Sequence, residues 1–402
     1  MTNCNKVIES IWDGYNNGSS ARYDDLKHMR QLFSEQIKNK TRKERRFLLA
    51  LFKIACHLKI RFQFNVTDFE KYIDSNFRAF AILTWLIETK NTLSAQLFFQ
   101  KFNRLLSHQE KKQIQNELYL LENVIEIQLL SDSRYNKVRY FCNRQYSRPL
   151  IITFDPVDSN KRIGSFGIKF CVENKFDVVH FALAGKTQYQ YLGRDFFFKT
   201  LKIISTKYPK TILYGSSLGG FAALYYSDIF NSDVIALSPY DPYHPYILKK
   251  FNKEINHKAI YQADIENFPV TTGRIIMTLD RSIPGDLEFY NHFLKKKFSK
   301  AELFFADYYG HPITTILQKT KQVRQVILAA LEGGGFLPNR KIIEQDSYYF
   351  YNQAIYLCRI GNFAIAKTVL MYALTIEDTE KYRKFLSLLE SKKGIPSPHL
   401  NT

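Results

Sequence analysis

The sequence predicts an α/β protein whose mostly parallel sheet is covered by helices on both faces and lies between two helical regions. Between residues 136 and 335, short apolar runs rich in β-branched and aromatic residues alternate with helical stretches. Most of these runs are continuously apolar, as is typical of strands buried on both faces. Before and after this region, apolar residues instead recur at three- and four-residue spacing, which indicates helices.

Residues 1–135 are expected to form an all-helical domain or a helical-repeat array. Glycine occurs there only at Gly14 and Gly18, and proline is absent. The helical spacing is clearest in four stretches: Arg45–Leu58, Phe77–Ile87, Leu93–Leu106 and Gln113–Leu130.

Residues 136–335 are expected to form the α/β domain that contains this sheet. Seven runs are predicted as strands: Val138–Cys142, Leu150–Phe154, Val178–Leu183, Thr211–Tyr214, Val234–Leu237, Ile275–Leu279 and Leu303–Phe305. In a parallel sheet of this kind, the active site lies at the carboxyl ends of the strands.

A helical hairpin is expected over residues 336–393, after the boundary marked by Gly333–Gly335 and Pro338. Tyr349–Leu370 has the helix, Gly-Asn turn and helix of one tetratricopeptide-type unit, although a repeat array needs several such copies. The tail, residues 394–402, is expected to be disordered.

The net charge of +19 over 402 residues favours anionic partners. A basic surface suits anionic lipid, an acidic polymer or an acidic cofactor, and it is also found on lysine-rich proteins whose charges are simply solvated. Nucleic acid is not expected, because no segment is arginine-rich with interleaved aromatic residues.

The five cysteines are widely spaced and form no Cys-x-x-Cys pair. A disulfide framework and a cysteine zinc site are therefore not expected, and no metal is predicted. The first residues do not show the basic-then-apolar layout of a secretory signal, so none is expected there, and the longest apolar stretch, Phe47–Leu58, is too short to span a bilayer. We expect a cytoplasmic protein. The basic stretch Lys38–Arg46 either contacts the inner membrane peripherally or is the charged start of a core helix.

The motif Gly-x-Ser-x-Gly occupies residues 215–219, between a predicted strand and a helical stretch. This context is that of a nucleophile elbow, a sharp turn that exposes one serine hydroxyl above the sheet. Ser217 has glycine two positions away on both sides and Ser216 does not, so Ser217 is the predicted nucleophile. An ordinary Gly/Ser turn is the alternative.

The partners of Ser217 are expected downstream, first an acid and then a histidine. His311 follows the last predicted strand and is the predicted base. Asp280, the first polar residue after the preceding strand, is the favoured acid. Asp286 is the alternative, although a role as a helix N-cap is sufficient to explain it.

An oxyanion hole needs two backbone N–H groups. Leu218, just after the nucleophile, is expected to supply one. The other is expected from Asp155 or Val157, in the loop after Leu150–Phe154, because Pro156 has no N–H.

The middle third of the chain resembles the α/β-hydrolase superfamily, and within it the serine-triad O-acetyltransferases of bacterial capsule and surface polysaccharides. The residues that carry this resemblance are Gln188–Tyr191, Gly215–Leu224, Asp280 and Gly310-His311. Gln188 departs from the pattern, since the group usually has tryptophan there. The resemblance implies acetyl-CoA as a co-substrate, no tightly bound cofactor, an anionic polysaccharide acceptor, and other capsule-synthesis proteins at the inner membrane as partners.

The leading hypothesis is therefore an O-acetyltransferase that passes an acetyl group through Ser217 to a sugar hydroxyl. A carboxylesterase or deacetylase with the same triad is the first alternative, since only the final acceptor differs. A non-catalytic helical scaffold is the second.

Overall fold

The computed structural model describes residues 83, 86–87, 92–133, 135–156, 166–183, 189, 191–242, 244, 247–248 and 267–391. The chain divides into two compact units, Met1–Leu118 and Tyr119–Thr402, and each is described by itself. The predicted stretch Arg45–Leu58, the basic stretch Lys38–Arg46 and the tail 394–402 lie outside the described residues.

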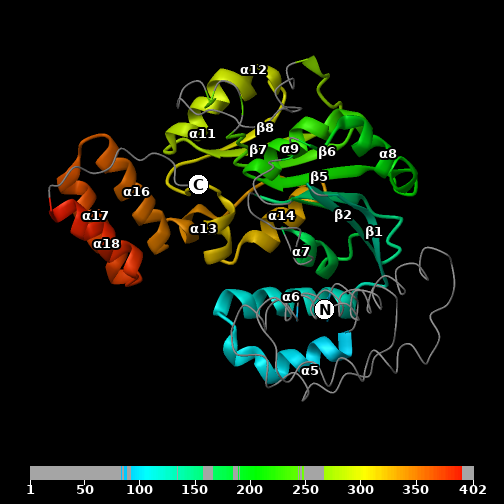
Figure 1. Cartoon of the computed structure of the whole chain (residues 1–402). Coiled ribbons are helices and arrows are strands. Elements are labelled where there is room, and N and C mark those ends of the chain that lie inside the picture. Colours follow the sequence, from blue (N-terminus) through cyan, green and yellow to red (C-terminus); the bar gives the residue numbers. More distant parts are fainter. Residues whose placement is uncertain are drawn as a thin grey trace, which may run out of the picture. The chain divides into compact units, whose positions relative to one another are not determined.

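The second unit contains an eight-stranded sheet in the order β1-β2-β4-β3-β5-β6-β7-β8 (Figure 1). β2 runs antiparallel to its neighbours β1 and β4, and all the other pairs are parallel. The strands are β1 (Glu126–Asp132), β2 (Asn136–Cys142), β3 (Leu150–Phe154), β4 (Val178–Leu183), β5 (Thr211–Ser216), β6 (Asp233–Leu237), β7 (Ile275–Asp280) and β8 (Glu302–Ala306). The predicted mostly parallel sheet is confirmed, and each of the seven predicted runs is a strand.

The eighth strand, β1, was not predicted. The helix expected over Gln113–Leu130 is wrong in its second half, because α6 (His108–Asn123) ends and β1 begins at Glu126. β1 is an edge strand whose side chains are mostly half-buried or exposed. Its sequence therefore lacks the continuous apolar run that marks the inner strands.

Helices cover both faces of the sheet (Figure 1). On one face lie α8 (Arg194–Ser205), α9 (Leu218–Tyr226) and α11 (Pro284–Phe289), and on the other lie α7 (Ile168–Glu173), α13 (Thr314–Lys319) and α14 (Val323–Leu331). Shorter elements are η4 (Ser227–Phe230), η6 (Tyr290–Leu294) and α12 (Lys295–Lys297). The chain turns between α13 and α14 at Lys321, whose φ is 57°.

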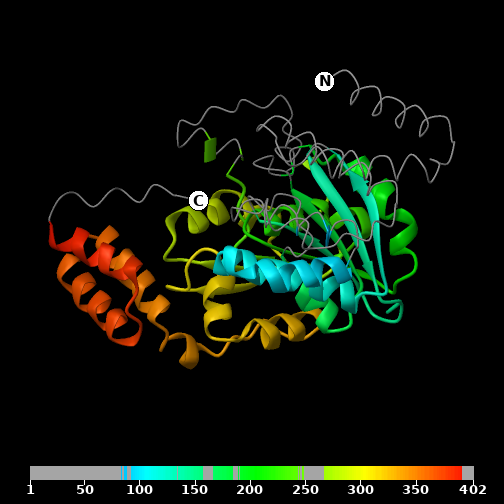
Figure 2. The same ribbon diagram turned by 60° about the horizontal axis from the view of Figure 1, so that its bottom comes forward.

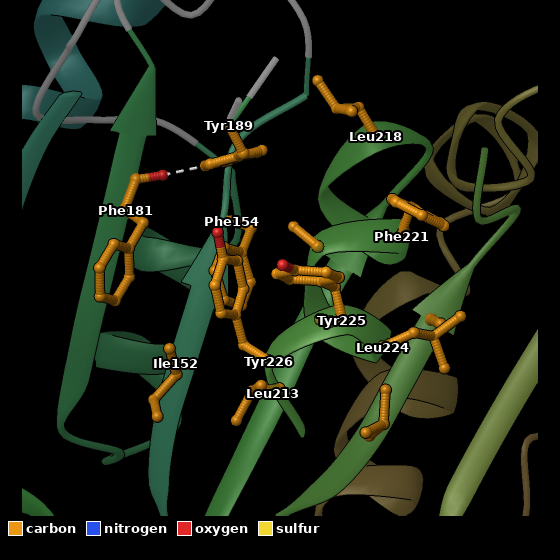
Figure 3. Close-up of a cluster of buried hydrophobic side chains, with 14 of the residues drawn as sticks. Ile152, Phe154, Phe181, Tyr189, Leu213, Leu218, Phe221, Leu224, Tyr225 and Tyr226 are labelled. Atoms are coloured by element: carbon orange, nitrogen blue, oxygen red, sulfur yellow. Dashed lines mark hydrogen bonds between the residues drawn. The ribbon is translucent and has the colours of Figure 1, made fainter. Parts of the chain in front are cut away.

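Aromatic side chains fill the core between the sheet and α9 (Figure 3). The ring of Phe154 stacks on Phe181 at 5.4 Å and on Tyr226 at 5.8 Å between centroids. Such pairs contribute about 0.5–1.5 kcal/mol each beyond the area that they bury. This packing fixes α9, and with it the serine that precedes it, against the centre of the sheet.

Four helices follow the sheet: α15 (Arg340–Ile343), α16 (Ser347–Arg359), α17 (Phe363–Ile376) and α18 (Glu380–Glu390). Figures 1 and 2 show α16, α17 and α18 gathered as one group at the end of the chain. They share a small core of Tyr351, Ala354, Leu370, Ala373 and Tyr382. The Gly-Asn turn between α16 and α17 was predicted, and Gly361 takes the left-handed φ of 81° there.

The first unit is described mainly through α5 (Thr92–Phe102), η3 (Asn103–Leu105) and the start of α6. Ala95, Phe98 and Phe102 are buried at helical spacing, as the sequence predicts for Leu93–Leu106. Across the part of the chain that the structure describes, no helix is long and apolar enough to cross a membrane.

Candidate active site

Ser217 occupies a sharp turn between β5 and α9. Its backbone has φ 54° and ψ −120°, a combination that a residue with a side chain adopts only at a cost of about 1–3 kcal/mol. The amide N–H of Ser217 donates to the carbonyl oxygen of Leu237 at the end of β6, 2.8 Å away, which holds the turn in place. The strained turn directs the hydroxyl away from the sheet, as in a nucleophile elbow.

The two glycines of the motif are required by close backbone approach. A Cβ atom on Gly215 would overlap the carbonyl of Gly219, and one on Gly219 would overlap the carbonyl of Phe154. The turn therefore closes only when both positions lack a side chain. This contact explains the spacing that singles out Ser217.

A chain of hydrogen bonds joins Ser217, His311 and Asp286. The Oγ of Ser217 lies 2.8 Å from Nε2 of His311, and Nδ1 of His311 lies 2.9 Å from Oδ2 of Asp286. Because a carboxylate only accepts, Nδ1 carries the proton and Nε2 is left to accept the serine proton. The side chains of His311 and Asp286 are only 10% and 3% exposed, so this chain is largely shielded from water.

The structure corrects the choice of acid. Asp280 was favoured for orienting His311, but its carboxylate is taken up by other donors: the backbone N–H groups of Ser282, Tyr308 and Gly310, and the hydroxyl of Ser282. Asp286, the alternative, makes the bond to His311. Asp280 ends β7 as expected, but it stabilises the turn beside His311 instead of the imidazole.

Asp286 is also not the N-cap of its helix. α11 begins at Pro284 after Ile283, the N-cap residue, which makes no side-chain capping bond. Asp286 instead lies in the first turn of α11, where a carboxylate is favoured by the helix dipole. From this position in α11, which follows β7, the carboxylate reaches His311, which follows β8.

The surroundings of His311 favour its protonated form. Burial by itself lowers the pKa of the imidazole, but the charge of Asp286, its hydrogen bond and the more remote charge of Asp280 outweigh it, so the pKa lies above its ordinary value of 6.5. Burial also raises the pKa of Asp280, against the opposing effect of its hydrogen bonds.

One predicted donor of the oxyanion hole fits the structure. Leu218 is the first residue of α9, and the first N–H groups of a helix have no intrahelical acceptor. Asp155 does not fit, because its N–H donates to the carbonyl of Phe181 at 3.3 Å. Val157 lies outside the described residues.

A second histidine–aspartate pair lies inside the sheet, and sequence reasoning missed it. His180 of β4 stands beside Thr153 of β3, and its Nδ1 is 2.8 Å from the threonine hydroxyl. Its Nε2 is 3.2 Å from Oδ1 of Asp155, and that oxygen accepts a hydrogen bond from the N–H of Phe166. The signal in the sequence was a histidine within the apolar run Val178–Leu183, where a buried polar side chain needs partners.

The described tyrosines of the segment Gln188–Tyr191 have structural roles. Tyr189 is buried in the aromatic core, and its hydroxyl donates to the carbonyl oxygen of Phe181 at 3.0 Å (Figure 3). The carbonyl oxygen of Asp155 also lies 3.0 Å from this hydroxyl. Tyr191 stacks on Tyr135 at 3.9 Å between centroids. Gln188 itself lies outside the described residues.

No protein-family model matches the chain, and no curated protein matches it. Solved structures are similar to about half of it. A putative thioesterase from Silicibacter sp. is 12% identical over 50% of this chain and 83% of its own, with a TM-score of 0.38. An esterase from Pyrobaculum calidifontis is 13% identical over 56% and 92%, with a TM-score of 0.38. Acetyl xylan esterase 1 from Thermoanaerobacterium sp. is 14% identical over 51% and 90%, with a TM-score of 0.33.

The strand order and the places of the site residues define the fold. The serine follows β5 through a nucleophile elbow, the acid follows β7 and the histidine follows β8. This is an α/β-hydrolase arrangement. In the part of the chain that the structure describes, no group of acidic, histidine or cysteine side chains is placed to hold a metal ion.

Proposed function

We propose that this chain is a serine-dependent ester hydrolase that works through an acyl-enzyme. The observation that carries the proposal is the continuous hydrogen-bond chain from Ser217 through His311 to Asp286, at the carboxyl end of a parallel sheet. A strained elbow, a base and an orienting carboxylate are together the requirements for activating a serine hydroxyl.

The proposed reaction has two halves. As the Oγ of Ser217 attacks the carbonyl carbon of the ester, Nε2 of His311 takes the hydroxyl proton, and Asp286 stabilises the imidazolium that forms. The N–H of Leu218 donates to the oxyanion, and His311 returns the proton to the departing alcohol. Water then gives a proton to His311 and attacks the acyl-serine. His311 returns that proton to the Oγ of Ser217 as the bond to the acyl group breaks, which releases the acid and restores both residues.

A second candidate is transfer of the acyl group to a sugar hydroxyl, with acetyl-CoA as donor and an anionic polysaccharide as acceptor. Two observations favour it: the net charge of +19, and the half-buried rings of Tyr308, Tyr349 and Tyr356. Tyr308 lies in the turn just before His311, and its ring contacts those of Tyr349 and Tyr356 on α16. Aromatic faces of this kind pack against sugar rings. In that case, other capsule-synthesis proteins at the inner membrane are the expected partners.

The deciding experiment measures acyl release from p-nitrophenyl acetate and from acetyl-CoA, with and without acidic polysaccharides, for the wild type and Ser217→Ala. Ester hydrolysis that needs no acceptor and is lost by at least about 10⁴-fold in the variant supports the hydrolase. Thiol release that depends on the polysaccharide supports the transferase. Full turnover by Ser217→Ala contradicts both.

A further inference from the structure

Two short turns carry the residues that act on Ser217. The first, here called the β7 turn, is residues 281–283 and leads into the helix of Asp286. The second, the histidine turn, is residues 307–311 and ends at His311. Asp280 joins them, because its carboxylate accepts the N–H of Ser282 in one turn at 2.7 Å and that of Gly310 in the other at 2.6 Å.

Helix α16 contacts both turns from outside the sheet. The side-chain amide of Asn352 donates to the carbonyl of Tyr308 in the histidine turn at 3.3 Å, and Nη1 of Arg359 donates to the carbonyl of Ser282 in the β7 turn at 3.1 Å. Asn352 is buried. One helix face therefore holds the two turns together across the edge of the site.

The close fit at Gly310 shows how tightly α16 packs on the histidine turn. A Cβ atom on Gly310 would come within 2.8 Å of both the Asn352 amide nitrogen and the Tyr348 hydroxyl. The φ of Gly310 is +83°, which also favours glycine. The ring of Tyr308 adds contacts with Tyr349 and Tyr356, at 5.6 and 5.5 Å between centroids.

We propose that α16 is a positioning element of the active site, in which Asn352 and Arg359 hold the histidine turn and the β7 turn so that His311 stays in line with Ser217. This proposal rests on the proposed serine chemistry. The C-terminal helices are then part of the machinery that sets the rate, since small displacements of a base have large effects on catalysis.

The test measures the rate at which a fluorophosphonate labels Ser217, because that rate reports activation of the hydroxyl without any natural substrate. Asn352→Leu and Arg359→Met should label about tenfold more slowly or worse, with unchanged final stoichiometry. With p-nitrophenyl acetate, the loss should fall on kcat and leave KM unchanged. Arg359→Lys, which retains a cationic donor, should recover part of the rate.

Matched controls are Gln353→Leu on the same helix and Arg383→Met on α18, where Arg383 is exposed and pairs with Asp378. Both should label at the wild-type rate. Circular dichroism and thermal melting establish which variants fold. If Asn352→Leu does not fold, the comparison of Arg359→Met with Arg359→Lys decides the test. Labelling of folded Asn352→Leu and Arg359→Met at the wild-type rate overturns the positioning role while leaving the serine chemistry intact.

If the wild type is not labelled, the proposed function fails, and the positioning role is read from the NMR signal of the His311 Nδ1 proton. That signal should shift or broaden in Asn352→Leu and Arg359→Met and stay in place in the two controls. An unchanged signal in folded variants contradicts the proposal.

Discussion

Among the residues that the structure describes, the pairs His311–Asp286 and His180–Asp155 are both buried but differ in their hydrogen bonds. In the first, both ring nitrogens of His311 make hydrogen bonds, one to the nucleophile and one to the acid. In the second, His180 is completely buried and bonds Thr153 through Nδ1, whereas its Nε2 has no hydrogen bond among the described residues despite lying 3.2 Å from Asp155.

The difference shows that proximity of a histidine to a carboxylate does not make a base. His311 lies beyond the carboxyl end of β8, where the lone pair of its Nε2 faces the hydroxyl of Ser217 in the strained elbow. His180 lies in the middle of β4, where its neighbours are the side chains of an adjacent strand. In the proposed mechanism the first pair moves a proton, whereas the second pair lies at the end of β3, which is adjacent to β5 and the elbow.

The largest expected effect separates the two histidines. His311→Gln should lower ester hydrolysis by about 10⁶-fold, because Nε2 of His311 is the acceptor placed 2.8 Å from the serine Oγ. His180→Gln should leave the rate per folded molecule near that of the wild type but lower the free energy of unfolding by about 1–3 kcal/mol. Rates with p-nitrophenyl acetate and unfolding in urea measure the two quantities. A rate loss in His180→Gln as large as that in His311→Gln would erase the distinction.

Substitutions of Asp286 and Asp155 should also differ, one lowering activity and the other stability, but the loss of activity should be smaller than for His311. Asp286→Ala should reduce kcat by about 10⁴-fold, because His311 loses the group that fixes its tautomer and stabilises its charge. Asp155→Ala should instead cost about 1–3 kcal/mol of stability, because the N–H of Phe166 loses its acceptor. The same assays apply. Normal activity in Asp286→Ala would return the role of acid to Asp280.

Features that depend on a few neighbouring residues could be predicted from the sequence, whereas features that depend on how distant segments pack could not. The elbow was predictable because its glycines and its serine lie within five residues, and the base because it directly follows a strand. The choice between Asp280 and Asp286 depended on how α11 winds after β7, which no local pattern states. The pairing of His180 with Thr153 depends on the register of β3 against β4, and β1 was missed because an edge strand needs no continuous apolar run.

The smallest expected effect is a shift in the pH profile, which tests whether the charge of Asp280 raises the pKa of His311. The neutral imidazole is the base, so kcat/KM should fall as the pH drops through the pKa of His311, which the two carboxylates hold above 6.5. The raised pKa also means that His311 stabilises the fold below its ordinary pKa and that this contribution is lost as the pH rises through the folded-state pKa.

Asp280→Asn removes one of the charges that raise this pKa, so the midpoint of the pH profile should move to lower pH. Asp307→Asn is the matched control, because that carboxylate is 41% exposed and already pairs with Arg281. Its midpoint should stay in place, since solvent screens an exposed charge. A midpoint that rises in Asp280→Asn would mean that the buried carboxylate acts on His311 through the shape of the histidine turn and not through its charge.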